Sequence, residues 1–266
     1  MGAGKLGELV LLERAGPVAV LTLNRAERHN SLVPPLLEEL LAALEAVRAA
    51  GRLESPQAVR AAVLQANGRS FSTGGDIGGF RTHLEDLAAY ASEIVGLLNQ
   101  VILALVELPV PVVAAVHGIV TGGSLGLVLG CDVVLVAPEA GFTPYYTVVG
   151  FSPDGGWTAM LPTVIGPKPA AEVLLRNLTI TAEQAVAWGL ASRVVPTERI
   201  RHEALSVAQD IAAHKPGSVR QTKHLLRLAD SDLAARLEVE RARFVEQIGT
   251  AEARKGIIAF VEDRGK

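Results

Sequence analysis

Apolar runs alternate with polar, glycine-containing loops along residues 8 to 195. Short β-branched runs bounded by turn residues predict strands, and longer runs with an apolar residue every three or four positions predict helices. A hairpin is expected where Gly16-Pro17 separates the first two such runs. The predicted strands cover residues 8–13, 18–24, 61–66, 112–116 and 132–136, and the predicted long helices cover residues 31–50 and 84–108.

The stretch from Pro109 to Val136 organises the rest of the chain. It predicts a strand buried on both faces, a glycine-rich turn, a short helix at residues 124–129 and a second buried strand. A strand that leads through a glycine turn into a helix leaves backbone N–H groups unpaired and facing outward. Such groups can hold a phosphate, or an oxygen that becomes negative during a reaction.

The second half of the chain predicts a glycine-containing loop at residues 150–156, then a helix at residues 157–164. Thr181 and Gln184 form a capping box for a further short helix. Because strands and helices alternate up to residue 196, we predict an α/β core at residues 1–196 and a C-terminal helical region at residues 197–266. The helices expected in that region cover residues 198–213, 217–229, 231–248 and 251–263.

The composition excludes several classes of protein. Of the 266 residues 49% are apolar, which excludes intrinsic disorder, and the net charge of −3 gives no reason to expect nucleic acid as a partner. We see neither a leader segment nor an apolar run of about 18 residues, and so expect no membrane span. The single cysteine, Cys131, favours a reducing, cytoplasmic setting. The histidines have no metal-ligand spacing, so no metal is expected.

Two glycine loops, residues 71–77 and 118–124, each follow an apolar strand and lead toward the start of a helix. Each can therefore offer a free backbone N–H. Two such groups converging on one oxygen form an oxyanion hole, in which each donor is worth about 2.7–4 kcal/mol of transition-state stabilisation. Spacing alone leaves this interpretation and a pair of unliganded tight turns equally open.

Residues 122–126 read Gly-Gly-Ser-Leu-Gly and match the G-x-S-x-G motif of serine hydrolases. That chemistry needs an acidic residue and then a histidine at the ends of later strands. The later histidines fall instead in the helical tail. We therefore favour Ser124 as a small residue that lets the short helix approach the sheet.

Asp154 lies in a Ser-Pro-Asp-Gly-Gly loop just before a predicted helix. It is either a helix cap or a general acid/base that Phe151, Tyr146 and Trp157 partly enclose. Apolar surroundings raise the pKa of a carboxyl group toward the range in which it can take and return a proton.

Taken together, these loops resemble the crotonase, or enoyl-CoA hydratase/isomerase, superfamily over nearly the whole chain. The resemblance implies a spiral of ββα turns with a C-terminal helical region that assembles trimers or pairs of trimers. The motifs that carry it are Leu23-Asn-Arg25, Phe71-Ser-Thr-Gly-Gly-Asp-Ile77, residues 111–132, the loop at 150–156, Leu178–Ala185, Trp188-Gly-Leu190 and Ala253–Phe260.

The resemblance implies an acyl-CoA thioester as substrate and no cofactor besides its coenzyme A. It places the oxyanion-hole donors on Gly75 and Gly123, and lays the loop from Gly74 to Gly78 beside the coenzyme A arm. The residues expected to contact the substrate are Arg28, Ser72, Gly74, Asp76, Ile77, Gly78, Tyr146 and Trp157.

The departures from the family pattern bear on the reaction. Where family hydratases carry two glutamates, this sequence has Gly126 and Tyr146, and neither does acid/base work near neutral pH. Asp154 matches the proton-shuttling aspartate of several family isomerases. We therefore predict an enoyl-CoA isomerase. The alternatives are a hydratase, a dehalogenase or thioesterase-type member (Asn99 stands where dehalogenases have a histidine), and a non-catalytic CoA-binding scaffold.

Overall fold

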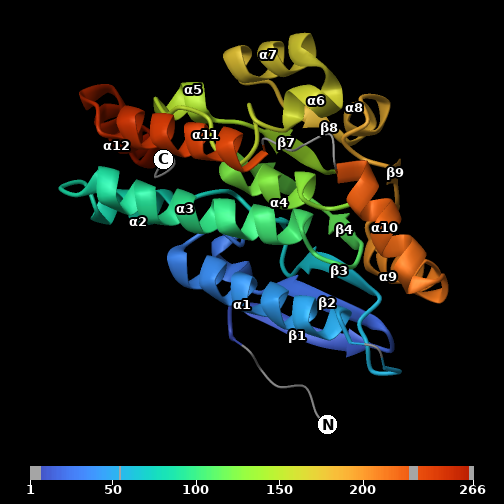
Figure 1. The fold of residues 1–266 in the computed structure, drawn as a ribbon. Helices are drawn as coiled ribbons and strands as arrows, with labels where there is room; N and C mark the ends of the chain where they lie inside the picture. The colour runs from blue at the N-terminus through green and yellow to red at the C-terminus, as the bar shows by residue number, and fades with distance from the viewer. Residues whose placement is uncertain (1–6, 54, 228–232, 264–266) are drawn as a thin grey trace.

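The computed structural model describes residues 7–53, 55–227 and 233–263. A six-stranded sheet of order β1-β2-β3-β4-β6-β9 lies at its centre, and a smaller sheet has the order β5-β7-β8 (Figure 1). The larger sheet consists of β1 (Val10–Ala15), β2 (Val18–Leu23), β3 (Ala61–Ala66), β4 (Val112–Val116), β6 (Val133–Val136) and β9 (Arg193–Val194). The smaller sheet consists of β5 (Ile119–Thr121), β7 (Gly141–Thr143) and β8 (Ile180–Thr181).

The central strands of the larger sheet, β2, β3 and β4, are buried on both faces. β1 and β2 form the expected antiparallel hairpin, and from β2 onward neighbouring strands run parallel. Successive residues of a strand point to opposite faces. Leu64 in β3 therefore joins the core under the long helices, whereas its neighbour Val63 joins a second core on the other face.

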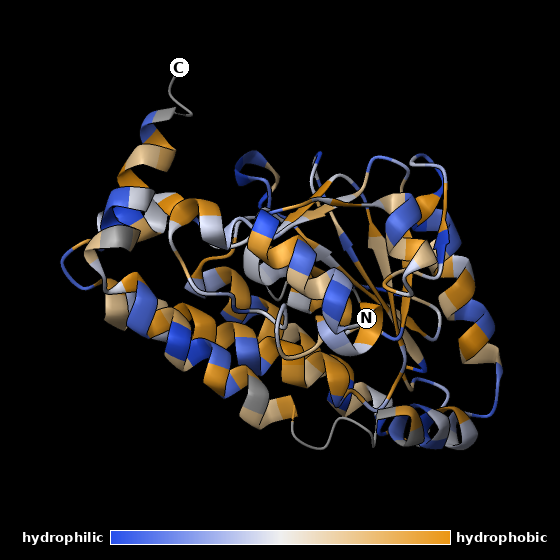
Figure 2. Cartoon of the chain, turned by 90° about the horizontal axis from the view of Figure 1, so that it is seen from above, coloured by the Kyte–Doolittle hydropathy of each residue, from blue (hydrophilic) through white to orange (hydrophobic). Residues whose placement is uncertain are grey.

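Helices cover both faces of this sheet. On one face α3 packs between α1 and α11, and on the other α9 packs against β2, β3 and β4. Figure 2 shows the strands largely in orange and the outward stretches of the helices in blue. The helices are α1 (Pro34–Gly51), α2 (Ile77–Thr82), α3 (Leu87–Val106), α4 (Leu125–Leu129), α5 (Tyr146–Val149), α6 (Leu161–Ile165), α7 (Pro167–Arg176), α8 (Ala182–Ala187), α9 (Ile200–Ala213), α10 (Pro216–Arg227), α11 (Leu233–Ile248) and α12 (Ala251–Asp263).

Within the described residues, α3 is the one helix whose length and apolar composition match a membrane span. More than half of its apolar stretch (56%) is buried inside the protein. That burial, against α1 and α11, is what a core helix requires.

Several helices differ from the sequence-based expectations. The first long helix begins at Pro34 rather than Ser31, because prolines fit the first helical turn. A short helix, α2, follows the first glycine loop, and the Asp76 side chain caps it. Residues 157–160 form turns, so that helix α6 starts only at Leu161. Helices α5 and α7 were not expected, and the predicted helix ends at residues 229 and 231 lie outside the described residues.

The C-terminal helices take part in the same fold as the sheet. α9 supplies the second core, α11 lies along α3, and α12 packs on α2 and α5. The predicted boundary at residue 196 therefore marks where the strands end, and the helices beyond it pack on the core and on the site described below.

Candidate active site

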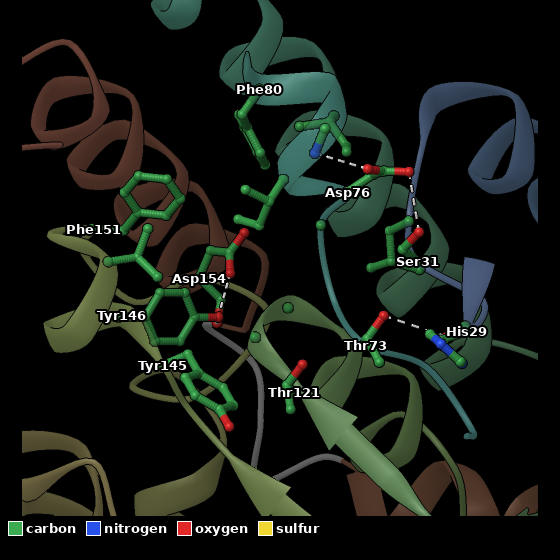
Figure 3. Close-up of a pocket in the computed structure, with 18 of the residues that line it drawn as sticks. His29, Ser31, Thr73, Asp76, Phe80, Thr121, Tyr145, Tyr146, Phe151 and Asp154 are labelled. Carbon is green, nitrogen blue, oxygen red and sulfur yellow. Dashed lines mark hydrogen bonds between the residues drawn. The ribbon is translucent and has the colours of Figure 1, made fainter. Parts of the chain in front are cut away.

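The two glycine loops and the loop of residues 150–156 meet at a cavity of about 490 Å³. Polar side chains gather at one end of it and aromatic ones at the other, with Asp154 facing the cavity from among the aromatic rings (Figure 3). The polar end includes Arg28, His29, Ser31, Thr73 and Asp76. The apolar end includes Phe80, Leu98, Val149, Phe151 and Phe244.

Backbone hydrogen bonds hold the two glycine loops side by side. The Ser72 N–H donates to Ile119 O at 3.1 Å, and the Thr121 N–H donates to Ser72 O at 3.2 Å. Gly74 has a φ of +72°, and a Cβ at that position would lie 2.5 Å from Thr121 O. This close approach of two backbones is possible only with glycine.

Gly75 and Gly123 line the cavity from these two loops. Among the described residues, the turns and loops contain no backbone hydrogen bond that the N–H of Gly75 or of Gly123 donates. Gly123 also lies in the first turn of the 3₁₀ helix η2 (Gly122–Ser124), where an N–H has no intrahelical acceptor. The cavity thus has two candidate donors for a ligand oxygen.

Asp154 lies directly against Gly123. A Cβ on Gly123 would lie 3.1 and 3.3 Å from the two carboxylate oxygens of Asp154. The next residue, Gly155, has a φ of +58° and approaches Gly123 so closely that its own Cβ would lie 2.4 Å from Gly123 Cα. The Tyr146 hydroxyl donates a hydrogen bond to Oδ1 of Asp154, as the dashed line in Figure 3 marks.

The surroundings of Asp154 favour its neutral form. The residue is only 6% exposed, and burial raises the pKa of its carboxyl group to about 7. The hydrogen bond from Tyr146 acts in the opposite direction, whereas the negative charge of Glu240 raises the pKa further. The Tyr146 pKa is itself raised well above its ordinary value by burial and by Asp154. A carboxyl group with a pKa near 7 can both take and return a proton.

Asp76 behaves differently at the polar end. Burial alone would raise the pKa of its carboxyl group, but the hydrogen bond and charge of Arg25, at 2.8 Å, lower it overall. Arg28 adds a weaker contact at 3.5 Å. Asp76 therefore stays ionised, and its Oδ1 accepts the Gly78 N–H at 2.9 Å to cap α2.

Comparison with known proteins agrees with this architecture. The family model for enoyl-CoA hydratase/isomerase matches residues 13–266. The chain belongs to that family. A probable enoyl-CoA hydratase of Rhizobium meliloti is 31% identical over 97% of this chain and 96% of that protein. A putative enoyl-CoA hydratase of Thermus thermophilus is 33% identical over 94% of this chain and 96% of that protein.

Solved structures of the family share the fold. The enoyl-CoA hydratase from Bacillus halodurans superposes with a TM-score of 0.86 at 25% identity, over 94% of this chain and 99% of that one. An enoyl-CoA hydratase/isomerase from Pseudoalteromonas atlantica gives a TM-score of 0.83 at 29% identity, over 96% of this chain and 97% of that one. The predicted crotonase-like α/β fold is thus confirmed.

Most of the residues predicted for this family site line the cavity. Asp154, Gly75, Gly123, Tyr146, Asp76, Ile77, Gly78 and Arg28 all do so. Three others support it from behind. The Ser72 hydroxyl donates to Asn30 O at 2.7 Å, Gly74 makes the close turn described above, and the fully buried Trp157 donates from Nε1 to Gly122 O at 2.7 Å.

Position 126, where the family resemblance predicts the glutamate of a hydratase, has no space for a side chain. A Cβ on Gly126 would lie 2.3 Å from Ile102 Cδ1 and 2.7 Å from Gly155 O. Tyr146, at the second of those positions, is occupied by its bond to Asp154. Of positions 126, 146 and 154, only Asp154 carries a carboxyl group, and it lies beside the candidate donor Gly123.

The residues that the alternative functions would use are held in structural hydrogen bonds. The Ser124 hydroxyl is buried between two backbone acceptors, Thr121 O at 2.6 Å and Ser72 O at 3.0 Å, which does not fit a nucleophile. Asn99 donates to Leu237 O at 3.0 Å, between α3 and α11. Within the described residues, no group of three His, Cys, Asp or Glu side chains could hold a metal.

The C-terminal helices contribute residues that local sequence patterns did not reveal. Phe244 of α11 and Phe260 of α12 line the cavity. Glu240 of α11 is buried and contacts the loop that follows Asp154. In the sequence, α11 and α12 show only an apolar face, and that pattern does not predict which part of the protein the face packs against.

Proposed function

We propose that this protein is an enoyl-CoA isomerase that moves a carbon–carbon double bond within an acyl-CoA thioester. The observation that carries the proposal is a buried carboxyl group with a raised pKa, Asp154, which lies against Gly123 in a cavity that Gly75 and Gly123 both line. Water addition in the family pattern uses two carboxylates, and position 126 cannot hold one of them. Moving a double bond needs only one.

In the proposed reaction, Asp154 removes a proton from C2 of a 3-enoyl thioester. The electron pair moves into the thioester, whose oxygen gains negative charge and accepts hydrogen bonds from Gly75 and Gly123. The same carboxyl group then returns the proton at C4. A double bond forms between C2 and C3, the one between C3 and C4 is lost, and the carbonyl is restored.

The same proposal extends to how the substrate binds, to the cellular setting and to the oligomeric state. Coenzyme A enters only as part of the substrate, and no other cofactor takes part. Its phosphates lie near Arg28 at the polar end, and the acyl group extends toward Phe80, Phe151 and Phe244. We further propose a reducing, cytoplasmic setting and a homotrimer or a dimer of trimers; exposed apolar side chains such as Leu175 (77%) are compatible with assembly.

The second candidate is a hydratase, which the names of the relatives favour. Purified protein should be given a 3-enoyl-CoA and, separately, a 2-enoyl-CoA, and the products quantified by chromatography and mass spectrometry. We expect the 3-enoyl-CoA to be isomerised at least about 100-fold faster than water is added to the 2-enoyl-CoA, since each missing acid/base group costs about that much. Faster hydration would support the hydratase. Tight binding of acyl-CoA without turnover would support the non-catalytic scaffold.

The hydrogen bond from Tyr146 predicts a pH effect. Asp154 must be ionised to act as a base, so kcat/KM should rise with pH through a midpoint near 7. Tyr146→Phe removes a bond that lowers the pKa of Asp154, and the midpoint should therefore move to higher pH. The measurement is the kcat/KM–pH profile of both proteins. An unchanged midpoint would show that this bond does not act on the ionising group.

A further inference from the structure

A second carboxylate, Glu240, is buried next to the loop that carries Asp154. It lies on α11 and is 4% exposed. Its Oε2 accepts the Gly156 N–H at 2.8 Å, and its Oε1 accepts the N–H groups of Thr158 at 2.8 Å and Ala159 at 2.6 Å. The Thr158 hydroxyl adds a fourth bond at 2.5 Å. One side chain therefore binds nearly the whole turn after Asp154.

This turn depends on the carboxylate because it has little regular structure of its own. Residues 155–160 are turns, and α6 begins only at Leu161. Gly155 and Gly156 both have positive φ, at +58° and +86°, a conformation that glycine adopts easily because it has no Cβ. N–H groups in such a buried turn need acceptors, and Glu240 supplies them. Its bonds hold the backbone that places Asp154 against Gly123.

Glu240 also brings charge to the site. Within the described residues it forms no ion pair, and its contacts are those N–H and hydroxyl groups. Two titratable groups act on Asp154: Tyr146 from α5 and Glu240 from α11. The side chains of α2 and α3 that line the cavity together with Asp154, such as Phe80 and Leu98, are apolar. Because both carboxyl groups are buried, dissolved salt screens the charge of Glu240 little where it acts on Asp154.

We propose that Glu240 is a positioning residue through which the C-terminal helix α11 holds the Asp154 loop in its reactive place. Its negative charge also makes the Asp154 carboxyl group a stronger base. The proposal rests on the proposed function as far as activity is concerned, but it makes a claim about Asp154 that can be measured without turnover. Helix α11 is then part of the site although 84 residues separate Glu240 from Gly156.

Two variants distinguish the effect of Glu240 on the position of the Asp154 loop from the effect of its negative charge. Glu240→Gln keeps the length of the side chain and loses its charge, whereas Glu240→Asp keeps the charge and is too short to reach the turn. Glu246→Gln is the matched control, because Glu246 is an exposed residue of the same helix paired with Arg243. We expect kcat to fall about 10- to 100-fold in both Glu240 variants, as small displacements of a catalytic group do, and to stay unchanged in the control.

The deciding measurement is the titration of Asp154 itself, followed by NMR of protein labelled with ¹³C-aspartate, with Asp154→Asn to assign the signal. Glu240→Gln should move the Asp154 midpoint to lower pH, because a like charge is lost. Glu240→Asp should leave it near that of the wild type, and Glu246→Gln should leave it unchanged. An Asp154 midpoint that does not move in Glu240→Gln, or kcat unchanged in Glu240→Asp, would overturn the proposal. A shifted midpoint in a protein that isomerises nothing would instead leave this inference standing and reject the proposed function.

Discussion

Replacing Asp154 with asparagine is expected to lower kcat for isomerisation of a 3-enoyl-CoA by about 10²- to 10⁴-fold, the range that a general acid/base supplies. Asparagine keeps the size of the side chain and can still accept the Tyr146 hydrogen bond, but it cannot carry a proton between two carbons. Because the backbone N–H groups and the cavity remain, the dissociation constant of an acyl-CoA product should change little. The measurement pairs steady-state kinetics with a binding titration.

The same variant should be more stable than the wild type at alkaline pH, which separates loss of chemistry from loss of fold. The pKa of Asp154 is about 7 in the folded protein against 3.8 for the free side chain, so the folded state binds the proton more tightly. Its contribution to stability is therefore largest at low pH, declines between about pH 4 and 7, and is constant above. Between low and high pH, the contribution of Asp154 to the free energy of unfolding changes by at most roughly 4 kcal/mol.

Chemical unfolding of both proteins at pH 5 and pH 8 tests this sign. The free energy of unfolding of Asp154→Asn should exceed that of the wild type by more at pH 8 than at pH 5. A variant that is inactive and also less stable at pH 8 would mean that Asp154 serves the fold and not the reaction.

Gly126→Glu restores the residue that family hydratases carry and is expected to destabilise the protein by more than about 3 kcal/mol. Even one added methyl group would lie 2.3 Å from Ile102 Cδ1 and 2.7 Å from a backbone oxygen. Overpacking of this kind costs about 1–3 kcal/mol for Gly126→Ala, and a buried unpaired charge adds to it. We expect no gain of hydratase activity. A stable Gly126→Glu variant that adds water to a 2-enoyl-CoA would contradict the conclusion that position 126 has no room for a side chain.

Gly96→Ala is the matched control for this steric argument. Gly96 lies in α3, and the nearest atom to an added Cβ is Arg241 Cδ at 3.9 Å, an ordinary contact. Alanine favours the helical state over glycine by up to about 1 kcal/mol. Gly96→Ala should thus be neutral or stabilising in the same unfolding assay, while Gly126→Ala should be destabilising.

The parts of the fold that local rules govern were predictable from the sequence. The hairpin at Gly16-Pro17 and the buried strand at residues 112–116 agree with the structure, since alternation and turn residues act over a few positions. Helix α2 was missed because Gly78 and Gly79 disfavour helix, and the Asp76 cap and packing on α12 overcome that preference.

The sequence predicted the site residues that lie in short loop motifs. It did not predict those that segments distant in the chain bring to the cavity. The glycine loops and Asp154 line the same cavity, as the family resemblance implied, whereas spacing alone had left the role of the loops open. Trp157 was expected in contact with substrate, but its ring is fully buried behind Gly122. Glu240 has no local signature, because a glutamate in an amphipathic helix usually faces solvent and only the fold brings it to Gly156.

The central claim is that one carboxyl group both removes and returns the proton. Its most direct test is a single-turnover NMR experiment with a 3-enoyl-CoA that carries deuterium at C2. Asp154 is only 6% exposed, so the label it removes should exchange slowly with solvent, and part of it should reappear at C4 of the 2-enoyl product. Complete loss of the label to water within one turnover would contradict transfer by one shielded carboxyl group.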